Sequence, residues 1–495
     1  MEKRDAVRIW HRGSPGFSAD GSKDALIIFS VALANFMARL DSYIVNVSLP
    51  TMARYFGSSL SEVSRIVFLY VLAVSSTLLL FGKMGDRMGL KRFFLWGYII
   101  FTGGSLLCGL SANITMLTVF RFVQGLGSSM LAATSLAIIS RHISPEKTGR
   151  AFGIFTSASA LGITLGAPLG GFITEYISWH WIFFINVPIG IAAIIIAGKV
   201  IPGKVLHKQD LDIPRFDYPG AFLILAAISL LLLALNFGQE RGWTSTEIVS
   251  GFLLSLLCGF LFFLREKRAI SPIIDMSLFF SPPLFFPLLG NFIMYLTIAA
   301  HNFLIPFYLD LLKHMSPATI GFFLMIYSIV FVVVPSFAGK YCDDRNSAYI
   351  SILAMFVTAF SFFFFSFTLH LGGLLFVIIF FVVRAVGNGM FIPPNNILIM
   401  KDSSEEDKGG ISGMLNTVTS LGVTIGVVLF ETIFSQIIHK AGGDHTLSGP
   451  GFSPANLQSG FRYVFLLLGF ISVVGIIVAF LTPTDAKRKI REVSV

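Results

Sequence analysis

Five charged residues lie well inside long apolar stretches of the sequence, away from their ends, and they are the residues best suited to chemistry. They are Arg39, Asp41, Arg121, Arg384 and Glu431. A charged side chain inside a lipid bilayer is costly, so such residues mark ion pathways or substrate sites by default. A carboxylate there can take up and release a proton, and an arginine can hold a carboxylate or an anionic ligand. The predicted chemistry is therefore ion binding and proton transfer.

Asp41 and Arg121 are expected to form a pair. Asp41 lies 16 residues into one apolar stretch, and Arg121 lies six residues into another that runs the opposite way. At about 1.5 Å per residue both lie at a similar depth, on the outer side of the midplane. Burial favours the protonated acid and the arginine favours the carboxylate, so Asp41 can alternate between proton and substrate. The alternative is a structural ion pair that only locks the helices.

Three further charges have two interpretations each. Glu431 is a second candidate proton carrier, unless it lies in a wet outer vestibule. Arg39 is about 200° from Asp41 around a helix, so the two do not share a face. Arg39 either faces a cavity, where it would favour anionic or zwitterionic compounds, or snorkels or pairs elsewhere. Arg384 lies one residue out of register with Arg121 when Gly125 and Gly387 are aligned. It is either the counterpart of Arg121 or a helix–helix hydrogen-bond donor.

A substrate cavity is expected to be lined by aromatic and polar side chains. An apolar aromatic wall with a few polar groups suits bulky amphipathic ligands. The candidate substrate-binding residues are Phe36, Arg39, Tyr43, Gln124, Asn291, Tyr295, His301, Asn302, Arg384 and Asn416. The sequence has no Walker-type loop, catalytic triad or His/Cys metal cluster. We therefore expect no enzymatic activity, no metal and no cofactor, and a transport process driven by the proton gradient.

The elements that must position these residues are membrane-spanning helices. Hydrophobic residues make up 55% of the 495 residues and charged residues 13%, against about 25% charged in ordinary globular chains. A water-soluble chain of this length could not cover itself with so few charges. A helix needs about 20 mostly apolar residues to cross a bilayer. We find fourteen such runs: Ala25–Leu49, Glu62–Phe81, Phe93–Leu110, Thr115–Ile139, Arg150–Thr174, Trp181–Ala197, Tyr218–Phe237, Glu247–Leu264, Leu284–Leu309, Ala318–Ala338, Ala348–Leu369, Leu374–Leu398, Gly410–Ile438 and Phe461–Leu481.

The basic residues predict the orientation. Of the 36 Lys and Arg residues, 27 fall in the two terminal tails and the alternate loops on the same side, and six fall on the other side. Cytoplasmic loops carry the excess of Lys and Arg, so both termini are expected to be cytoplasmic. The net charge of +9 is thus a topology signal, which argues against nucleic-acid binding. The first 24 residues are polar and do not resemble a signal peptide. The three cysteines give no disulfide framework.

The chain contains an internal repeat. Asn35-Phe36 recurs as Asn291-Phe292 at a shift of 256, and Gly82-Lys83 recurs as Gly339-Lys340 at a shift of 257. The segment from Gly149 to Gly166 recurs from Gly409 to Gly426 at a shift of 260. We expect an all-α fold of two homologous six-helix bundles with two inserted helices. The predicted divisions are a tail (1–24), a first bundle (25–200), a linker with two extra helices (201–283), a second bundle (284–482) and a tail (483–495).

Repeated bundles with parallel topology are an architecture of secondary transporters, which bind substrate near the midplane between the halves and alternate access by rocking. A duplicated membrane protein that transports nothing is the alternative. Glycines recurring near every fourth position of the fifth span let helix backbones approach closely in lipid, and Pro168 bends that helix. We interpret this segment as a pliable packing seam between the halves. Charges at the loop between spans two and three can form pairs that break when one face opens.

Several motifs identify a family. Gly82-Lys-Met-Gly-Asp86-Arg87-Met-Gly89-Leu-Lys91-Arg92 resembles the loop 2–3 signature of the major facilitator superfamily. Arg121-Phe-Val-Gln124-Gly125-Leu-Gly127 resembles its fourth-helix motif, and Gly162-Ile-Thr-Leu-Gly166-Ala-Pro168-Leu-Gly170-Gly171 its exporter-type fifth-helix motif. Segments Leu40–Pro50 and Trp179–Gly190 are similar to signatures of its 14-helix drug:proton antiporter branch. The branch usually has an apolar residue at Arg39, and Gly-Pro where this chain has Gly-Ala-Pro.

The resemblance implies the major facilitator fold and a multi-pass protein of the cell membrane, the bacterial cytoplasmic membrane in the first instance, working as a monomer. The residues expected to gate conformational change are Gly82, Asp86, Arg87, Arg92, Asp343, Gly166, Pro168 and Gly170. The favoured function is a proton-driven exporter of amphipathic small molecules, with protons and the bilayer as its other partners. The alternatives are a dedicated exporter or flipper of a lipid, siderophore or other metabolite, an uptake permease, and a non-transporting sensor or assembly protein.

Overall fold

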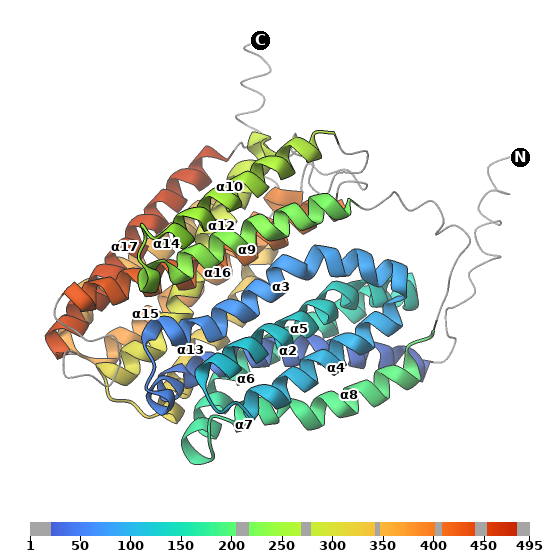
Figure 1. The fold of residues 1–495 in the computed structure, drawn as a ribbon, viewed down its shortest axis with the longest axis horizontal. Coiled ribbons are helices and arrows are strands. Elements are labelled where there is room, and N and C mark those ends of the chain that lie inside the picture. The colour runs from blue at the N-terminus through green and yellow to red at the C-terminus, as the bar shows by residue number, and fades with distance from the viewer. Residues whose placement is uncertain are drawn as a thin grey trace, which may run out of the picture.

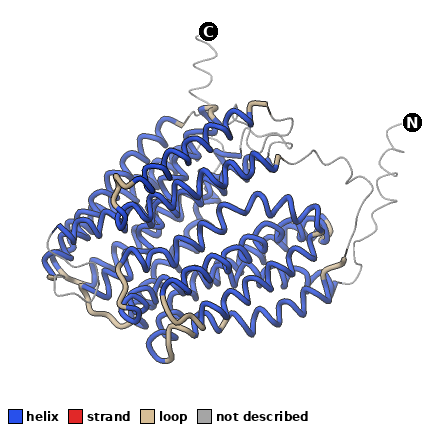
Figure 2. Tube along the Cα trace, in the orientation of Figure 1, coloured by secondary structure: helices blue, strands red, loops and turns tan. Residues whose placement is uncertain are grey.

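The computed structural model describes residues 21–203, 217–268, 279–341, 347–400, 408–440 and 453–482. Within these ranges the chain is helical apart from short loops and turns (Figure 2). The first half consists of α2 (Gly21–Phe56), α3 (Leu60–Met88), α4 (Leu90–Gly109), α5 (Ile114–His142), α6 (Pro145–Tyr176), α7 (Trp181–Phe184) and α8 (Asn186–Val200). The second half consists of α12 (Pro282–Leu311), α13 (Pro317–Tyr341), α14 (Ser347–Thr368), η2 (Leu369–Leu371), α15 (Leu374–Met400), α16 (Lys408–Lys440) and α17 (Pro454–Leu481). Between the halves lie α9 (Tyr218–Arg241) and α10 (Thr246–Glu266).

Local signals set several helix ends. Ser59 caps α3 and forms a capping box with Glu62, which satisfies backbone N–H groups that the first turn leaves free. Asn113 caps α5, and its side chain accepts from the N–H of Met116. Gly89 separates α3 from α4 with a φ of 94°, a conformation that costs other residues strain. The sixth predicted span is interrupted, since α7 ends at Phe184 and α8 begins at Asn186.

Thirteen helices in the described ranges are long and apolar enough to cross a membrane. They correspond to thirteen of the fourteen predicted runs. The remaining run, Phe93–Leu110, forms helix α4, which is not among the thirteen. The all-helical architecture is therefore confirmed, and the count of fourteen spans and the cytoplasmic location of the termini stay predictions.

Glycine packing reveals the repeat in three dimensions. A Cβ on Gly162 of α6 would lie 2.7 Å from the carbonyl oxygen of Phe36 on α2. A Cβ on Gly422 of α16 would lie 2.8 Å from the carbonyl oxygen of Phe292 on α12. The two contacts are related by shifts of 260 and 256, as the sequence predicts. Helices α2 and α6 thus cross in the first half as α12 and α16 cross in the second.

The same test corrects the predicted alignment of α5 with α15. A Cβ on Gly127 would meet the backbone N of Phe101 at 2.3 Å, and a Cβ on Gly387 would meet the backbone N of Thr358 at 3.0 Å. Phe101 and Thr358 are related by the shift of 257, so Gly127 corresponds to Gly387, at a shift of 260. The alignment of Gly125 with Gly387 was wrong by two residues, because both helices repeat glycine at a spacing of two.

The two halves pack together at the end predicted to face outside. One hydrophobic cluster there joins Ile44 and Phe183 of the first half to Phe303, Phe307 and other residues of the second. Towards the opposite end the clusters are separate, one within the first half and one built from the second half and the inserted helices. The first half (blue to teal) and the second (yellow to red) accordingly come together at one end of the molecule (Figure 1).

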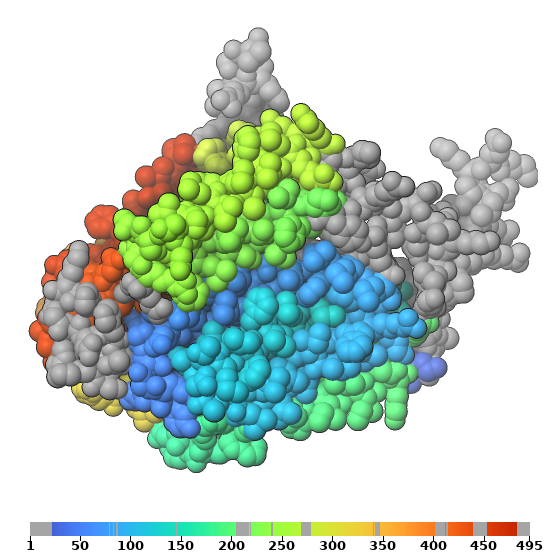
Figure 3. Space-filling model, in the orientation of Figure 1, coloured from blue at the N-terminus to red at the C-terminus, as the bar shows by residue number. Residues whose placement is uncertain are grey.

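The inserted pair lies against both halves. Helix α9 contacts α3 of the first half and α16 of the second, and α10 packs on α9. Phe68, Ile228 and Val428, from α3, α9 and α16, share one hydrophobic cluster. In the space-filling view the pair (green) covers part of the surface beside the first half (blue) (Figure 3). The insert therefore covers a side of the boundary between the halves.

Candidate functional site

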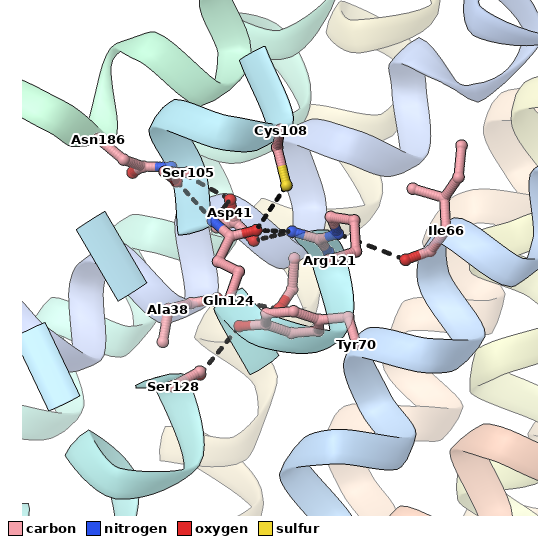
Figure 4. A network of polar contacts seen from close by, with 11 residues as sticks. Ala38, Asp41, Ile66, Tyr70, Ser105, Cys108, Arg121, Gln124, Ser128 and Asn186 are labelled. Atoms are coloured by element: carbon pink, nitrogen blue, oxygen red, sulfur yellow. Dashed lines mark hydrogen bonds and ion pairs between the residues drawn. The ribbon is translucent and has the colours of Figure 1, made fainter. Parts of the chain in front are cut away.

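Asp41 on α2 is the centre of a buried polar network (Figure 4). Its side chain is 0% exposed. One carboxylate oxygen accepts a hydrogen bond at 2.5 Å from Arg121 of α5. The other accepts from Gln124 of α5 at 2.9 Å and from Asn186 of α8 at 3.1 Å. A buried carboxylate is tolerated when it is paired and hydrogen-bonded, as Asp41 is.

Arg121 is held from several directions. Its Nη1 also donates to Oε1 of Gln124 at 2.6 Å, and its Nε donates to the carbonyl oxygen of Ile66 on α3 at 3.3 Å. The guanidinium lies 4.0 Å from the centre of the Tyr70 ring, also on α3, which gives a cation–π contact. The network therefore fixes the arginine between α2, α3 and α5.

A serine completes the network from α4. Ser105 accepts from Gln124 at 2.5 Å and from Asn186 at 3.2 Å, and the thiol of Cys108 lies 3.8 Å from Gln124. Five helices of the first half are therefore joined by one polar network around a single ionisable acid. Gain of a proton at Asp41 would weaken the bonds that hold these helices together.

The predicted Asp41–Arg121 pair is confirmed as a direct contact, and Gln124 lies in the same site. The sequence reasoning did not assign Asn186, Ser105 or Tyr70 to it. Asn186 had a usable signal, since it is a polar residue within the apolar run at Trp181–Ala197. Ser105 and Tyr70 had none, because small hydroxyls and tyrosines are common in such helices.

The second half contains a related but differently charged arrangement. Arg384 of α15 is 0% exposed and occupies the repeat position of Gln124, at the shift of 260. It donates to Thr297 of α12 at 2.7 Å, to Thr358 of α14 at 3.3 Å, and to Asn388. Its guanidinium lies 4.5 Å from the Phe362 ring. Arg384 is therefore the counterpart of Gln124, whereas Arg121 corresponds to Phe381.

Several predicted cavity residues come together where the halves meet. Tyr43 of α2 and Tyr295 and Asn302 of α12 are half-buried, and Arg39 is exposed. Tyr43 lies within electrostatic range of Arg39, Tyr295, Asn302 and Tyr327. Tyr327 of α13 was not predicted, and it accepts a hydrogen bond from Asn388 at 2.5 Å. Tyrosines from both halves thus form one central cluster, which we call the tyrosine cluster (Tyr43, Tyr295 and Tyr327).

The remaining cavity candidates have different surroundings. His301 is buried beside the Tyr327 ring, with ring centres 4.7 Å apart. Asn291 donates to Thr419 at 2.7 Å and so ties α12 to α16, which favours a structural role. Phe36 is half-buried and Asn416 is exposed.

Glu431 is 1% exposed, so the alternative of a wet outer vestibule does not fit this structure. The hydroxyl of Thr432 donates to its carboxylate at 3.5 Å. At the shift of 260 its counterpart is Gly171, where a Cβ would lie 2.2 Å from the carbonyl oxygen of Pro317. The acid therefore stands at the repeat position of a glycine that packs closely against α13.

The predicted gating segment lies at the junction of α3 and α4. Gly82, Asp86 and Arg87 are in α3, and exposed Arg92 is in the first turn of α4. The side chains of Asp86 and Arg87, and all of Asp343, lie outside the described part of the structure.

The glycine seam of α6 needs correction. A Cβ on Gly166 would meet Tyr43 at 2.6 Å, and one on Gly170 would meet the carbonyl oxygen of Ile44 at 2.6 Å. These glycines therefore face α2 of their own half, because they share one face of the helix at a spacing of four. Contact between the halves is made one position further on, by Gly171, and beside Pro168, where a Cβ on Gly321 would lie 3.0 Å from the proline Cα.

Polar contacts connect the halves at the predicted outer end. Arg54 at the end of α2 pairs with Asp310 at the end of α12. The carboxylate of Glu175 on α6 accepts from the backbone N–H of Ala318 at 2.8 Å, where the first turn of α13 favours a negative charge. Nearby, His180 stacks on Trp179 with ring centres 3.7 Å apart. Burial lowers the pKa of His180, because it disfavours the charged imidazolium.

No group of three or more His, Cys, Asp or Glu residues that could hold a metal ion occurs in the described ranges. The site's ionisable groups are instead an acid and arginines. Such groups can exchange a proton and attract a charged ligand.

Comparison with known proteins gives the family. The sequence profile described as "Major Facilitator Superfamily" matches residues 31–210 and 213–427. The riboflavin transporter RibZ of Clostridioides difficile is 33% identical over 423 residues, which cover 83% of this chain and 88% of that protein. Multidrug resistance protein 3 of Bacillus subtilis is 27% identical over 85% of this chain and 81% of that protein.

Solved structures give the same fold. A bacterial homologue of the human lysosomal transporter Spinster, in an inward-facing and occupied conformation, superposes with a TM-score of 0.64 at 12% identity. The match covers 94% of this chain and 97% of that one. A peptide transporter in complex with sulfate also gives 0.64, at 16% identity, over 92% of this chain and 95% of that one.

Proposed function

Because the chain belongs to the major facilitator superfamily, we propose that it is a proton-coupled exporter of amphipathic small molecules that works by alternating access. The family and the thirteen helices able to cross a bilayer make it a multi-pass integral membrane protein. Its relatives named above come from bacteria, which favours the bacterial cell membrane as its location.

The observation that carries the proposal is the buried Asp41–Arg121 pair. An ionisable acid in this position can hold a proton during the crossing, because neutralisation removes its attraction to the arginine. Arg121 would then keep its bonds to Gln124 and Ile66 while Asp41 loses its strongest partner. Since Asp41 connects α2 to α5 and α8, protonation changes the packing of the first half.

The packing of the halves supports a cycle with two end states. In this structure the halves meet at the predicted outer end, through Arg54–Asp310 and the shared hydrophobic cluster. We infer a state open towards the cytoplasm, in which cargo reaches the tyrosine cluster from inside. Protonation of Asp41 from outside then drives the return step. Glu431 is a second candidate carrier, since it is buried in α16.

The finer features follow from the same proposal. Helix α4 also crosses the membrane and brings the number of spans to fourteen. Both termini are cytoplasmic, and the protein works as a monomer without a cofactor. Asp86, Arg87, Arg92 and Asp343 gate the cytoplasmic face. Multidrug-resistance relatives support a place in the drug:proton antiporter branch.

A second candidate is the dedicated export of a metabolite. It is favoured by the 33% identity to a riboflavin transporter and by the tyrosine cluster, on which a planar ring can stack. The two candidates differ in selectivity and share the proton-coupling site.

The test is accumulation of cationic, zwitterionic and anionic dyes and of riboflavin in proteoliposomes with an imposed pH gradient. Wild type, Asp41→Asn and the control Asp24→Asn are compared. Asp24 lies on the same helix and pairs with Lys147 at 2.7 Å. We expect accumulation in wild type and in the control, and its loss in Asp41→Asn. Accumulation that is unchanged in Asp41→Asn overturns the carrier role.

A further inference from the structure

The second half repeats the geometry of the Asp41 site but not its charge. At the position of Asp41 the second half has Thr297, and at the position of Gln124 it has Arg384, by shifts of 256 and 260. The hydrogen bond between Gln124 and Asp41 at 2.9 Å is repeated between Arg384 and Thr297 at 2.7 Å. Compared with the Asp41 site, the second half therefore lacks the acid and has a cation in place of the glutamine.

The peripheral contacts repeat as well. The hydroxyl of Tyr70 donates to Ser128 at 2.9 Å, and Asn388 donates to the Tyr327 hydroxyl at 2.5 Å. Tyr70 and Tyr327 are related by the shift of 257, and Ser128 and Asn388 by the shift of 260. The two sites therefore share one framework, which makes the difference in charge between them meaningful.

Arg384 has no counter-charge among the residues that the structure describes. The oxygen atoms to which it donates belong to Thr297, Thr358 and Asn388, all neutral, and its Nε has no hydrogen-bond partner within the described ranges. An arginine keeps its charge in proteins, and a buried charge is costly unless it is paired. The N-terminal site meets this requirement with Asp41.

A second unsatisfied group lies beside Tyr327. His301 is 0% exposed, and neither of its ring nitrogens has a hydrogen-bond partner in the described part of the chain. Its ring lies 4.7 Å from the Tyr327 ring. A buried polar atom without a partner has lost its hydrogen bonds to water and gained none in return, which is unfavourable. Arg384 and His301 thus offer unused donors next to the tyrosine cluster.

We infer that Arg384, with His301, forms a binding site for the anionic group of an organic cargo molecule. A carboxylate, sulfonate or phosphate would supply the missing negative charge and could accept from the guanidinium fork and the imidazole. A ring attached to that group would lie against the half-buried Tyr43 and Tyr295. The inference rests on the proposed export function and narrows its cargo to amphipathic acids and zwitterions.

The test measures binding without any gradient, so its failure is separate from a failure of proton coupling. The melting temperature of the purified full-length protein is titrated with sodium benzoate, with benzamide as the neutral analogue, and with sodium chloride. We expect saturable stabilisation by benzoate alone. Arg384→Gln should raise the dissociation constant of benzoate at least about tenfold. Arg462→Gln, which changes an exposed arginine of α17, should leave it unchanged.

A second variant adds the missing acid. Thr297→Asp copies Asp41 into the second half, so it should neutralise Arg384, raise the melting temperature and abolish the response to benzoate. Equal responses to benzoate and benzamide, or an unchanged response in Arg384→Gln and Thr297→Asp, would overturn the inference. Stabilisation by chloride equal to that by benzoate would indicate a site for a free ion and would overturn the assignment to cargo.

Discussion

Arg54 and Asp310 occupy the same position in the two repeats, 256 residues apart, and they pair with each other across the boundary between the halves. One end of α2 thus meets the equivalent end of α12. A contact between equivalent positions forms only when both halves approach their common axis. The pair therefore reports closure at the predicted outer end.

Asp310→Asn should loosen this end. The side chain of Arg54 is 47% exposed, so the pair contributes at most about 1 kcal/mol. We expect about fivefold faster hydrogen–deuterium exchange at the ends of α2 and α12, because 1 kcal/mol corresponds to about that factor. The double exchange Arg54→Asp with Asp310→Arg should restore slow exchange, and failure to do so would argue against the pair as the closing contact.

Replacing each of the two buried arginines should affect the stability of the protein differently. Arg121→Met leaves the Asp41 carboxylate buried without its partner, which typically costs about 3–5 kcal/mol. Arg384→Met removes an uncompensated cation, so its stability should be unchanged or higher. Thermal unfolding of the two variants in detergent tests this, and similar losses in both would contradict the difference in charge between the sites.

Glycine substitutions test the helix crossings. A Cβ on Gly127 would lie 2.3 Å from the backbone of Phe101, whereas no atom of the described residues beyond its own helix turn would lie within 4 Å of a Cβ on Gly153. We expect Gly127→Ala to lower the melting temperature strongly or to prevent folding. Gly153→Ala should stabilise by about 0.5–1 kcal/mol, since alanine favours the helix. Equal behaviour of the two variants would contradict the packing described for α4 and α5.

His180 should make the outer end sensitive to pH. Its pKa is lower in the folded chain than the ordinary value of about 6.5, so the unfolded chain binds more protons between the two values. Its contribution is therefore complete above about pH 6.5 and is lost as the pH falls towards the folded value. The melting temperature between about pH 8 and 5 should fall less in His180→Phe than in wild type. Identical pH profiles would exclude a role for His180.

Depth and repeat arithmetic were enough to predict part of the site. The Asp41–Arg121 contact follows from counting along two antiparallel helices, because rise per residue fixes depth. Asn186 stands out as a polar residue in an apolar run, but its partners could not be predicted, since its position depends on the break between α7 and α8. Tyr327 could not be assigned because its nearest partners come from three other helices.

The register of Arg384 shows a different limit. Gly125 and Gly127 recur with the same spacing as Gly387 and Gly389, so the letters alone fit two alignments. The two alignments are distinguished only by the backbone atoms that each glycine contacts in the structure. The spacing of the α6 glycines likewise shows that they share one face of the helix. It does not show which neighbouring helix that face contacts.

The most direct test of the central claim is infrared difference spectroscopy of the reconstituted protein on acidification. If Asp41 is the proton carrier, wild type gains the C=O band of a protonated carboxylic acid, and Asp41→Asn lacks that band while Asp24→Asn keeps it. A spectrum of Asp41→Asn identical to that of wild type would contradict the account, because the proton would then be held elsewhere.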